Sequence, residues 1–400
     1  MVYYDPVYSR HLNGNWRPPL ILEQLSRTPE AVRARRIAQA AAPDYLLMRG
    51  PIPSRFQHGM GVAFLADRVL KKNPDLKDYQ NLFLSAALMH DWGLPCFSHL
   101  AEPLLEKMTG MNGESFLGFV LEIYGWAKEV LKDFGVDYQD VVKVVTGDFE
   151  PLGEIINGSL DLDNLDNILR YAIAASLPGK KPNVIKVAVS FRFIDGKWYL
   201  LEDCLEDVKK WQSLRRQVYS SIYSNFNLSP VTMLYRAIYL AYQIGLIDAN
   251  FFLMNDDEAI DYLSRCGGEI SRLLERLISW EWYEEVFSLQ FESHYRSPIM
   301  RLANNPMSGL EAADTLCNRA KVEPGDVCVY VGRGRDKKSV TIPFISADPA
   351  EGKGKFFLAE DNDSPIYRLK VFVNPELDAS KKLEISNLAI EICNGNLDAS

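Results

Sequence analysis

The chain has 400 residues, of which 47% are hydrophobic and 24% are charged, and its formal net charge is −9. A surface field of that sign repels polyanions, so we expect no extended nucleic-acid site. The sequence shows neither an apolar run of about 18 residues, as a membrane span requires, nor the layout of a signal peptide at its N-terminus. We therefore expect a globular cytoplasmic protein without a membrane partner.

The first half of the chain has apolar residues at helical spacing. A helical region at 18–48, broken at Thr28-Pro29, precedes a long amphipathic stretch at 56–72, which Asn73-Pro74 ends. A strongly apolar helix at 79–93 follows. Further helices are predicted at 98–109, 114–133, 138–146 and 163–176.

The second half of the chain mixes helical and strand patterns. Alternation of apolar and polar residues over 183–203, with Asp195-Gly196 at the centre, predicts a β-hairpin. Helical spacing returns over about 203–290. Beyond a boundary near residue 305, short strand-like runs are followed by a closing helix; they lie at 325–334, 339–345, 354–360, 366–373 and, for the helix, 377–393.

The predicted fold class is mainly α. We expect a helical core with one small β-hairpin over residues 1–305 and a small α+β C-terminal domain over residues 306–400. The six cysteines are scattered and include no Cys-x-x-Cys pair, so neither a disulfide framework nor a cysteine-based zinc site is indicated.

The histidines are the most informative residues. Three of the five, His58, His90 and His99, fall within a stretch of 42 residues, and Asp91 directly follows His90 at the end of an apolar helix. Imidazole and carboxylate groups are common ligands of divalent Mn, Fe, Zn or Mg. An isolated His-Asp pair is more often a hydrogen-bonded core histidine beside a helix-terminal acid, so the pair needs further context.

Three segments provide that context: SRFQHGMGVAFLADRVL, ALMHDWGLPCFSHLAEPLL and LDLDNLDNILRYA. In this order they resemble the signature blocks of HD-domain dNTP triphosphohydrolases. The likeness also includes YDPVYS, SRTPEAVRARRIAQAA and WQSLRRQVYSSIY, and it covers most of residues 1–300, whereas the C-terminal domain matches loosely. The resemblance implies a helical HD core with a metal-dependent phosphohydrolase activity.

The resemblance also implies a set of catalytic side chains. Four of them would hold one divalent metal ion: His58, His90, Asp91 and Asp163. His99 would be the catalytic histidine, and Glu102 would fix its tautomer and keep it basic. The alternative is a His and a Glu in a first helical turn that interact only with the helix dipole and solvent.

Further positions resemble the substrate contacts of the family. Arg55 and Arg215 fall where arginines bind phosphate, a task suited to the planar guanidinium fork. Gln39 and Tyr223 fall beside the sugar, and Tyr171 replaces an acid that contacts the sugar 3′-hydroxyl. For Arg215 and Tyr223, an ordinary half-buried position on an amphipathic helix is an equally good interpretation.

Other positions depart from the family pattern. Leu94 stands where one branch of the family has a histidine, and Gly113 stands where many members have one; Asn167 replaces a tyrosine and Asn225 replaces a histidine. These changes leave the predicted metal ligands intact but alter the predicted contacts to sugar and base. The segment GRGRDKK at 332–338 lacks the strand–loop–helix context of a P-loop, so we interpret it as a basic β-turn.

The leading hypothesis is hydrolysis of a (deoxy)nucleoside triphosphate to nucleoside and triphosphate. One alternative is a phosphohydrolase that acts on a nucleoside monophosphate or a modified nucleotide, which the changes at Tyr171 and Asn167 favour. Another is a nucleotide-binding sensor without turnover, which the missing histidines at Leu94 and Gly113 favour. The resemblance further implies a homo-oligomer, with the C-terminal domain as a candidate for assembly.

Overall fold

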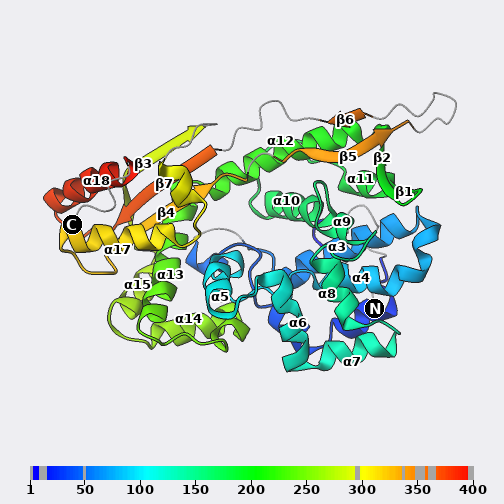
Figure 1. Ribbon diagram of the computed structural model, residues 1–400, viewed down its shortest axis with the longest axis horizontal. Coiled ribbons are helices and arrows are strands. Elements are labelled where there is room, and N and C mark those ends of the chain that lie inside the picture. The colour runs from blue at the N-terminus through cyan, green and yellow to red at the C-terminus, as the bar shows by residue number, and fades with distance from the viewer. Residues whose placement is uncertain are drawn as a thin grey trace.

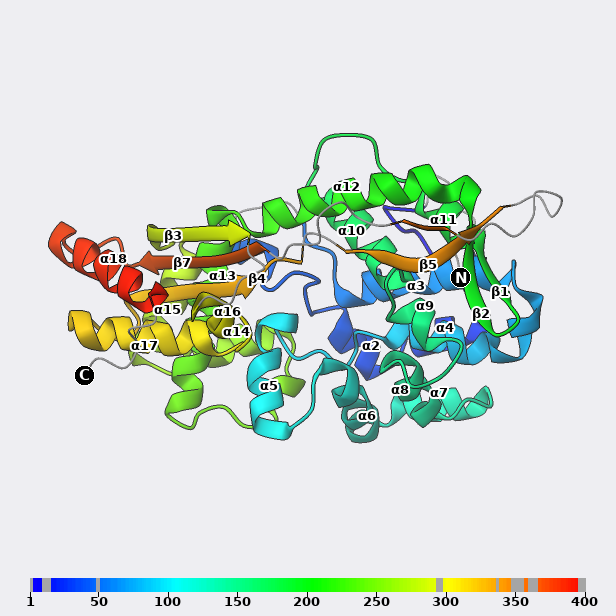
Figure 2. The same ribbon diagram turned by 45° about the horizontal axis from the view of Figure 1, so that its top comes forward.

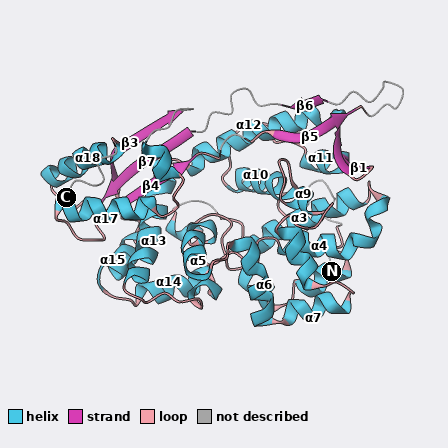
Figure 3. Cartoon of the chain, viewed as in Figure 1, coloured by secondary structure: helices cyan, strands magenta, loops and turns pink. Residues whose placement is uncertain are grey.

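The computed structural model describes residues 3–8, 16–47, 51–292, 298–335, 338–346, 356–358 and 366–394. The fold is mainly helical with two small sheets, so the predicted fold class is confirmed (Figures 1 and 3). The molecule is elongated, with a helical unit that carries the N-terminus at one end and a mixed unit that carries the C-terminus at the other (Figure 1). Among the described residues, no helix is long and apolar enough to cross a membrane.

The helices fall into two sets along the chain. The N-terminal unit contains α1 (Leu20–Leu25), α2 (Pro29–Ala34), α3 (Arg55–Leu70), α4 (Gln80–Met89), α5 (Glu102–Thr109), α6 (Gly113–Tyr124), α7 (Trp126–Asp133), α8 (Tyr138–Val145), α9 (Gly153–Ile156), α10 (Leu162–Ala174), α11 (Val184–Ser190) and α12 (Leu205–Ile222). The following helices are α13 (Asn225–Gln243), α14 (Asp256–Ser264), α15 (Gly268–Ile278), α16 (Pro298–Ala303), α17 (Ser308–Ala320) and α18 (Ala379–Cys393).

Helix α3 lies at the centre of the N-terminal unit. Ser54 and Gln57 form a capping box at its start. Two glycines then allow its neighbours to approach closely: a Cβ at Gly59 would lie 2.2 Å from the Leu88 carbonyl oxygen of α4, and a Cβ at Gly61 would lie 2.1 Å from Asp166 Oδ1 of α10. The sequence therefore brings α3, α4 and α10 together at one level, the level at which the predicted metal ligands lie.

The strands form one four-stranded and one three-stranded sheet. The strands are β1 (Phe191–Ile194), β2 (Lys197–Leu201), β3 (Glu284–Glu292), β4 (Val327–Arg333), β5 (Val340–Ile345), β6 (Phe356–Leu358) and β7 (Ile366–Val373). Their orders are β1-β2-β5-β6 and β3-β7-β4. Strand β5 pairs in parallel with β2, through Leu200 opposite Phe344 and Leu201 opposite Ile345.

The predicted hairpin is shorter than expected. Its turn has positive φ at Asp195 (50°) and Gly196 (77°), as a tight two-residue turn requires. The alternating pattern over residues 184–190 predicted a strand, and this prediction was wrong. These residues form helix α11. The Asn183 side chain caps that helix, and Val184 and Val187 are buried on it.

The second difference concerns β3, which lies inside the stretch predicted to be helical up to about residue 290. Helix α15 ends at Ile278, and Trp280 has a φ of 60°, which interrupts the helix. The strand then pairs antiparallel with β7. Pairing with a strand some 80 residues away is a tertiary effect, and local helical spacing cannot reveal it.

The strands beyond residue 306 divide between both units. Val340, Ile342 and Phe344 of β5 are buried in the same apolar core as α3 and α4. Cys328 of β4 and Phe372 of β7 belong to the core around α13 and α15. Figure 2 shows β5 beside β2 at one end of the molecule and β4 between β7 and the helices at the other end. The boundary at 305/306 stays a prediction.

Candidate metal centre and substrate cleft

Three helices bring three of the predicted metal ligands together. His58 lies on α3, His90 follows α4 directly, and Asp163 lies in the first turn of α10. The two imidazole Nε2 atoms are 3.1 Å apart, and Asp163 Oδ1 lies 2.8 Å from the first and 3.7 Å from the second. The ligand atoms of all three residues lie within 4.8 Å of one another. This spacing suits the coordination of one ion.

The Nδ1 atoms of both imidazoles already have hydrogen-bond partners. His58 Nδ1 lies 2.7 Å from Asp166 Oδ2, and His90 Nδ1 lies 2.9 Å from the Ala87 carbonyl oxygen. Because a carbonyl and an ionised carboxylate only accept, each Nδ1 carries the proton and donates it. In the structure His58 Nε2 lies at hydrogen-bond distance from Asp163 Oδ1; a bound ion would replace this contact and take up the lone pairs of both Nε2 atoms beside that carboxylate. This donor set fits a divalent ion such as Mn, Fe, Zn or Mg.

Asp91, the fourth predicted ligand, lies next to this cluster. Its Oδ2 atom is 3.6 Å from the Nε2 of His58 and 3.4 Å from the Nε2 of His90. The same oxygen accepts a hydrogen bond of 2.6 Å from Arg55 Nη1, with both side chains buried. Arg55 therefore fixes Asp91 at the edge of the cluster.

Arg55 makes two further bonds to the protein. Its Nε donates to Ser98 Oγ at 3.0 Å and its Nη2 donates to the Gln39 carbonyl oxygen at 2.9 Å. Three of the five N–H donors of a guanidinium are thus used within the chain. The Gln39 side chain donates to Asn167 Oδ1 at 3.0 Å. The phosphate contact of Arg55 and the sugar contact of Gln39 stay predictions.

The acids of the cluster are ionised at neutral pH. Burial opposes ionisation of Asp163, but hydrogen bonds from His58 and His90 hold its pKa well below the ordinary value. Burial likewise opposes ionisation of Asp91, but the charges of Arg55 and His90 lower its pKa well below the usual range. The centre therefore presents negative charge to a cation.

A buried network that sequence reasoning missed supports His58 from behind. Asp166 accepts from Arg170 Nε at 2.7 Å and from the Tyr8 hydroxyl at 2.7 Å, and Arg170 Nη2 donates to Asp5 at 2.9 Å. Burial opposes ionisation of Asp166, but Arg170 and His58 lower its pKa to about 2. The only signal in the sequence was the spacing Asp163-x-x-Asp166, which places both acids on one helical face.

Asp166→Asn should weaken metal binding by about 10- to 100-fold, the usual effect of losing a group that orients a ligating histidine. The amide can still contact His58, but it cannot hold the same tautomer by charge. Asp5→Asn is the matched control, because Asp5 contacts Arg170 rather than the imidazole. Metal titration of both variants checks this. Equal affinities in Asp166→Asn and the wild type would contradict it.

His99 and Glu102 form a hydrogen-bonded pair at the entrance of the metal cleft. His99 Nδ1 lies 2.8 Å from Glu102 Oε2, and Glu102 Oε1 accepts the Gly113 backbone N–H at 2.7 Å. Burial opposes ionisation of Glu102, but the hydrogen bond from His99 lowers its pKa. The cleft has a volume of about 100 Å³, and its wall also includes Leu94 and Glu114. Glu114 is a further acid in this cleft that sequence reasoning missed.

A buried carboxylate braces the loop that carries His99. Asp256 Oδ1 accepts the Phe97 N–H at 2.7 Å, and its Oδ2 accepts the Ala38 N–H at 2.8 Å. Phe97 and Ser98 have φ values of 61° and 55°, so this loop holds two strained residues that need such support. Burial raises the pKa of Asp256 to about 7.

The raised pKa of Asp256 predicts a pH-dependent stability. Between the ordinary carboxyl pKa and pH 7, the native protein keeps a proton that the unfolded chain releases, so stability falls as the pH rises through this window. The slope is at most about 1.4 kcal/mol per pH unit. Denaturant unfolding from pH 5 to 8 should show wild-type stability declining relative to Asp256→Asn. A constant difference between the two proteins would contradict this.

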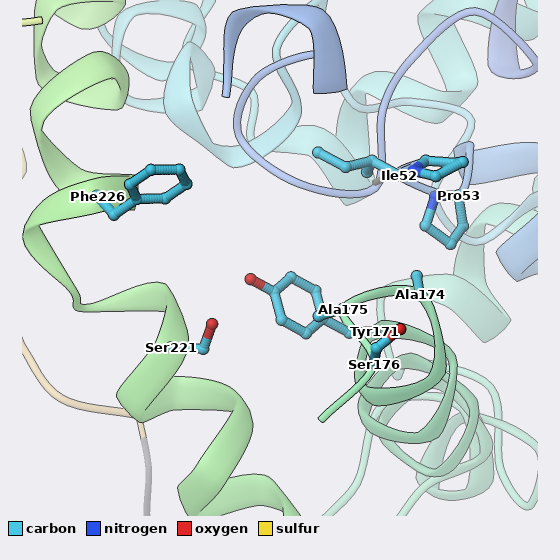
Figure 4. Close-up of a pocket in the computed structure, with 9 residues that line it drawn as sticks. Ile52, Pro53, Tyr171, Ala174, Ala175, Ser176, Ser221 and Phe226 are labelled. Carbon is cyan, nitrogen blue, oxygen red and sulfur yellow. The ribbon is translucent and has the colours of Figure 1, made fainter. Parts of the chain in front are cut away.

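Tyr171 lies one helical turn after Asn167 and lines a separate pocket of about 270 Å³. Figure 4 shows its hydroxyl directed across the pocket toward Ser221 and Phe226, with Pro53 on another side. The pocket therefore lies between α10, the residues before α3 and the junction of α12 and α13. The contact of Tyr171 with a sugar stays a prediction.

Arg215 and Tyr223 line a cleft of about 710 Å³, and His99 lines it too. Arg215 is buried; its Nη1 donates to Asn164 Oδ1 at 2.7 Å and its Nε donates to the Arg335 carbonyl oxygen at 3.1 Å. The Tyr223 hydroxyl accepts the Arg335 N–H at 3.0 Å. Both residues thus hold the segment that follows β4. The strands on either side of this segment, β4 and β5, lie in different sheets, so the described residues do not form the predicted β-turn between paired strands. The phosphate and sugar contacts of Arg215 and Tyr223 stay predictions.

A comparison with models of known protein families finds no match for the chain. A comparison with curated proteins gives two relatives, both uncharacterized. A protein of Bacillus subtilis, YwfO, is 27% identical over 230 residues, which are 56% of this chain and 51% of that protein. A protein of Methanocaldococcus jannaschii is 25% identical over 272 residues, which are 66% of this chain and 55% of that protein. The chain therefore spans about half the length of the curated relatives it matches.

Comparison with solved structures shows that the fold is shared. A hypothetical protein from Aquifex aeolicus matches with a TM-score of 0.71 and 22% identity, over 96% of this chain and 99% of that chain. A phosphohydrolase from Bacteroides thetaiotaomicron matches with a TM-score of 0.66 and 16% identity, over 89% of this chain and 96% of that chain. The chain thus adopts the fold of a protein known as a phosphohydrolase.

Proposed function

We propose that the chain is a metal-dependent phosphohydrolase. The observation that carries this proposal is the convergence of His58, His90 and Asp163 from three helices, with both imidazole Nδ1 atoms held by acceptors. The fold shared with the phosphohydrolase from Bacteroides thetaiotaomicron supports it. When bound, the ion would supply Lewis acidity toward a phosphoryl oxygen.

The side chains of the cleft have distinct tasks in this proposal. His58, His90, Asp163 and the neighbouring Asp91 would hold the ion. His99 donates its Nδ1 proton to Glu102, so its Nε2 is the atom that can hold or pass a proton at the cleft entrance. The half-exposed position of His99 gives water and a leaving group access to that nitrogen.

The substrate in this proposal is a nucleoside triphosphate, in particular a deoxynucleotide, cleaved to nucleoside and triphosphate. The spaced sequence blocks support it. The test incubates the protein, loaded with Mn, Mg, Fe or Co, with each dNTP and NTP and identifies the products by ion-exchange chromatography. Absence of any phosphate-containing product with every metal and nucleotide would overturn the proposal.

A nucleoside monophosphate or a modified nucleotide is the second candidate substrate. Two positions where the sequence departs from the family pattern favour this candidate. Asn167 is hydrogen-bonded to Gln39, and Tyr171 lines a pocket of its own. The products distinguish the two candidates. Release of triphosphate supports the first, whereas release of orthophosphate supports the second.

A further inference from the structure

The cleft at Arg215 and the metal cleft share His99 in their linings. A ligand that reaches the metal ligands in one can therefore extend past this imidazole into the other. The lining of the larger cleft includes residues of α12 and α13, residues of β4 and residues 334–335 that follow it. Its volume of about 710 Å³ is within the range of small-molecule sites.

The two spaces have opposite charge. The metal cleft is lined by four acids: Asp91, Glu102, Glu114 and Asp163. The larger cleft is lined by Arg215, Arg333 and Arg335, and none of the described residues around it is an aspartate or a glutamate. Three arginines without an acid stand out in a chain with a net charge of −9. The larger cleft therefore favours an anion.

The end of β4 and the residues after it, which carry Arg333 and Arg335, are held by several contacts. The backbone N–H and carbonyl of Arg335 are bonded to Tyr223 and Arg215, as described above. Further along, Lys338 Nζ lies 3.1 Å from Asp161 Oδ2, and the Lys338 carbonyl accepts from Gln212 at 3.4 Å. A backbone held in this way preorganises the side chains that it displays.

The displayed side chains are cationic. Arg333 and Arg335 are exposed, whereas Arg215 is buried and bonded within the chain. The Tyr223 ring packs against the Arg368 guanidinium, 4.2 Å from the ring centroid, and against Tyr330. Because the Tyr223 ring already packs against the protein, we do not expect it to stack on a ligand. The positive charges of Arg333 and Arg335 are then the groups by which this side of the cleft can recognise a ligand. Exposed guanidinium forks suit phosphate oxygens.

We propose that Arg333 and Arg335 form a subsite for an oligophosphate group, whose further phosphates extend from the metal centre past His99. The inference rests on the proposed function for the phosphate at the metal centre. In this proposal Arg333 and Arg335, at the end of β4 and just beyond it, make the protein select di- and triphosphates over monophosphates.

The test is calorimetric titration of the Mn-loaded full chain with inorganic tripolyphosphate and with orthophosphate, at equal Mn concentration in cell and syringe. The wild type should bind tripolyphosphate more tightly than orthophosphate. Arg333→Gln/Arg335→Gln should weaken tripolyphosphate binding by about 10- to 100-fold, because two charge-assisted contacts are lost. Arg333→Lys/Arg335→Lys, which retains the charge, should lose less.

A matched control removes the same charge elsewhere. Arg27→Gln/Arg265→Gln changes two exposed arginines, and neither residue lines the cleft. This variant should bind tripolyphosphate as the wild type does. Unchanged tripolyphosphate affinity in the Arg333/Arg335 glutamine variant, or an equal loss in the control, would overturn the subsite. Intact tripolyphosphate selectivity without turnover of any nucleotide would instead overturn the proposed function and support the subsite.

Discussion

Replacing Asp163 by Ala should reduce metal binding by more than about 100-fold and abolish metal-dependent hydrolysis. A supporting residue behind a ligand already contributes about 10- to 100-fold to metal affinity, and a ligand itself contributes more. Asp163 also supplies the carboxylate of the three-residue cluster, so its loss leaves Asp91, whose Oδ2 is already hydrogen-bonded to Arg55, as the remaining predicted carboxylate ligand. Bound metal can be measured by mass spectrometry after gel filtration, independently of turnover.

Asp261→Ala is the control for this experiment. Asp261 is exposed on α14 and pairs with Arg265, at a distance from the metal cleft. It should retain both metal and activity. If Asp163→Ala bound one equivalent of metal with wild-type affinity, the proposed centre would be wrong, whatever the activity of the variant.

Replacing His99 by Ala should lower kcat by about 10²- to 10⁴-fold, the range expected for loss of a general acid–base group. Metal content should stay at the wild-type level, because His99 lies outside the cluster of ligand atoms. Glu102→Gln should have a smaller effect, because the amide can still contact Nδ1 but no longer stabilises the charged ring. Steady-state kinetics on the substrate found in the nucleotide panel, together with metal analysis, would check both variants.

The His99 and Glu102 variants separate a catalytic pair from a structural one. A pair that only supports the loop would lower the thermal stability of both variants without a selective loss of kcat. Wild-type kcat in His99→Ala would therefore contradict the assigned role. The Asp256 carboxylate, which braces the same loop from behind, offers the comparison for a purely structural change.

The convergence of His58, His90 and Asp163 could be expected because these residues carry their chemistry in local sequence. His90-Asp91 and the Asp163 helix stand out by type and spacing, and three ordered blocks give them context. Their supports could not be predicted in the same way. Arg170 is one helical turn from Asp166, but Asp5 is 165 residues from Arg170 and Tyr8 is 158 residues from Asp166, and only the folded chain brings these two residues into the network. The long-range contacts of such a network leave no periodic pattern in the sequence.

The secondary structure was likewise predictable only where it depends on neighbouring residues. The Asp195-Gly196 turn was predictable because its backbone conformation depends on these two residues. Residues 184–190 and strand β3 were not, because their structure depends on distant partners. The role of residues 332–335 was also hidden. A basic segment is ordinary in sequence, and its place beside His99 depends on contacts with Arg215 and Tyr223.

The parallel pairing of β5 with β2 constrains how the molecule can deform. A single stretch of chain runs from β4, in the three-stranded sheet at one end, to β5, in the four-stranded sheet at the other. A wide separation of the two ends would pull on β5, which is held by its pairing with β2 and by the buried Phe344. We therefore expect ligands to enter by local movement of side chains and loops around the clefts, while the β2–β5 pairing keeps the two ends of the molecule joined.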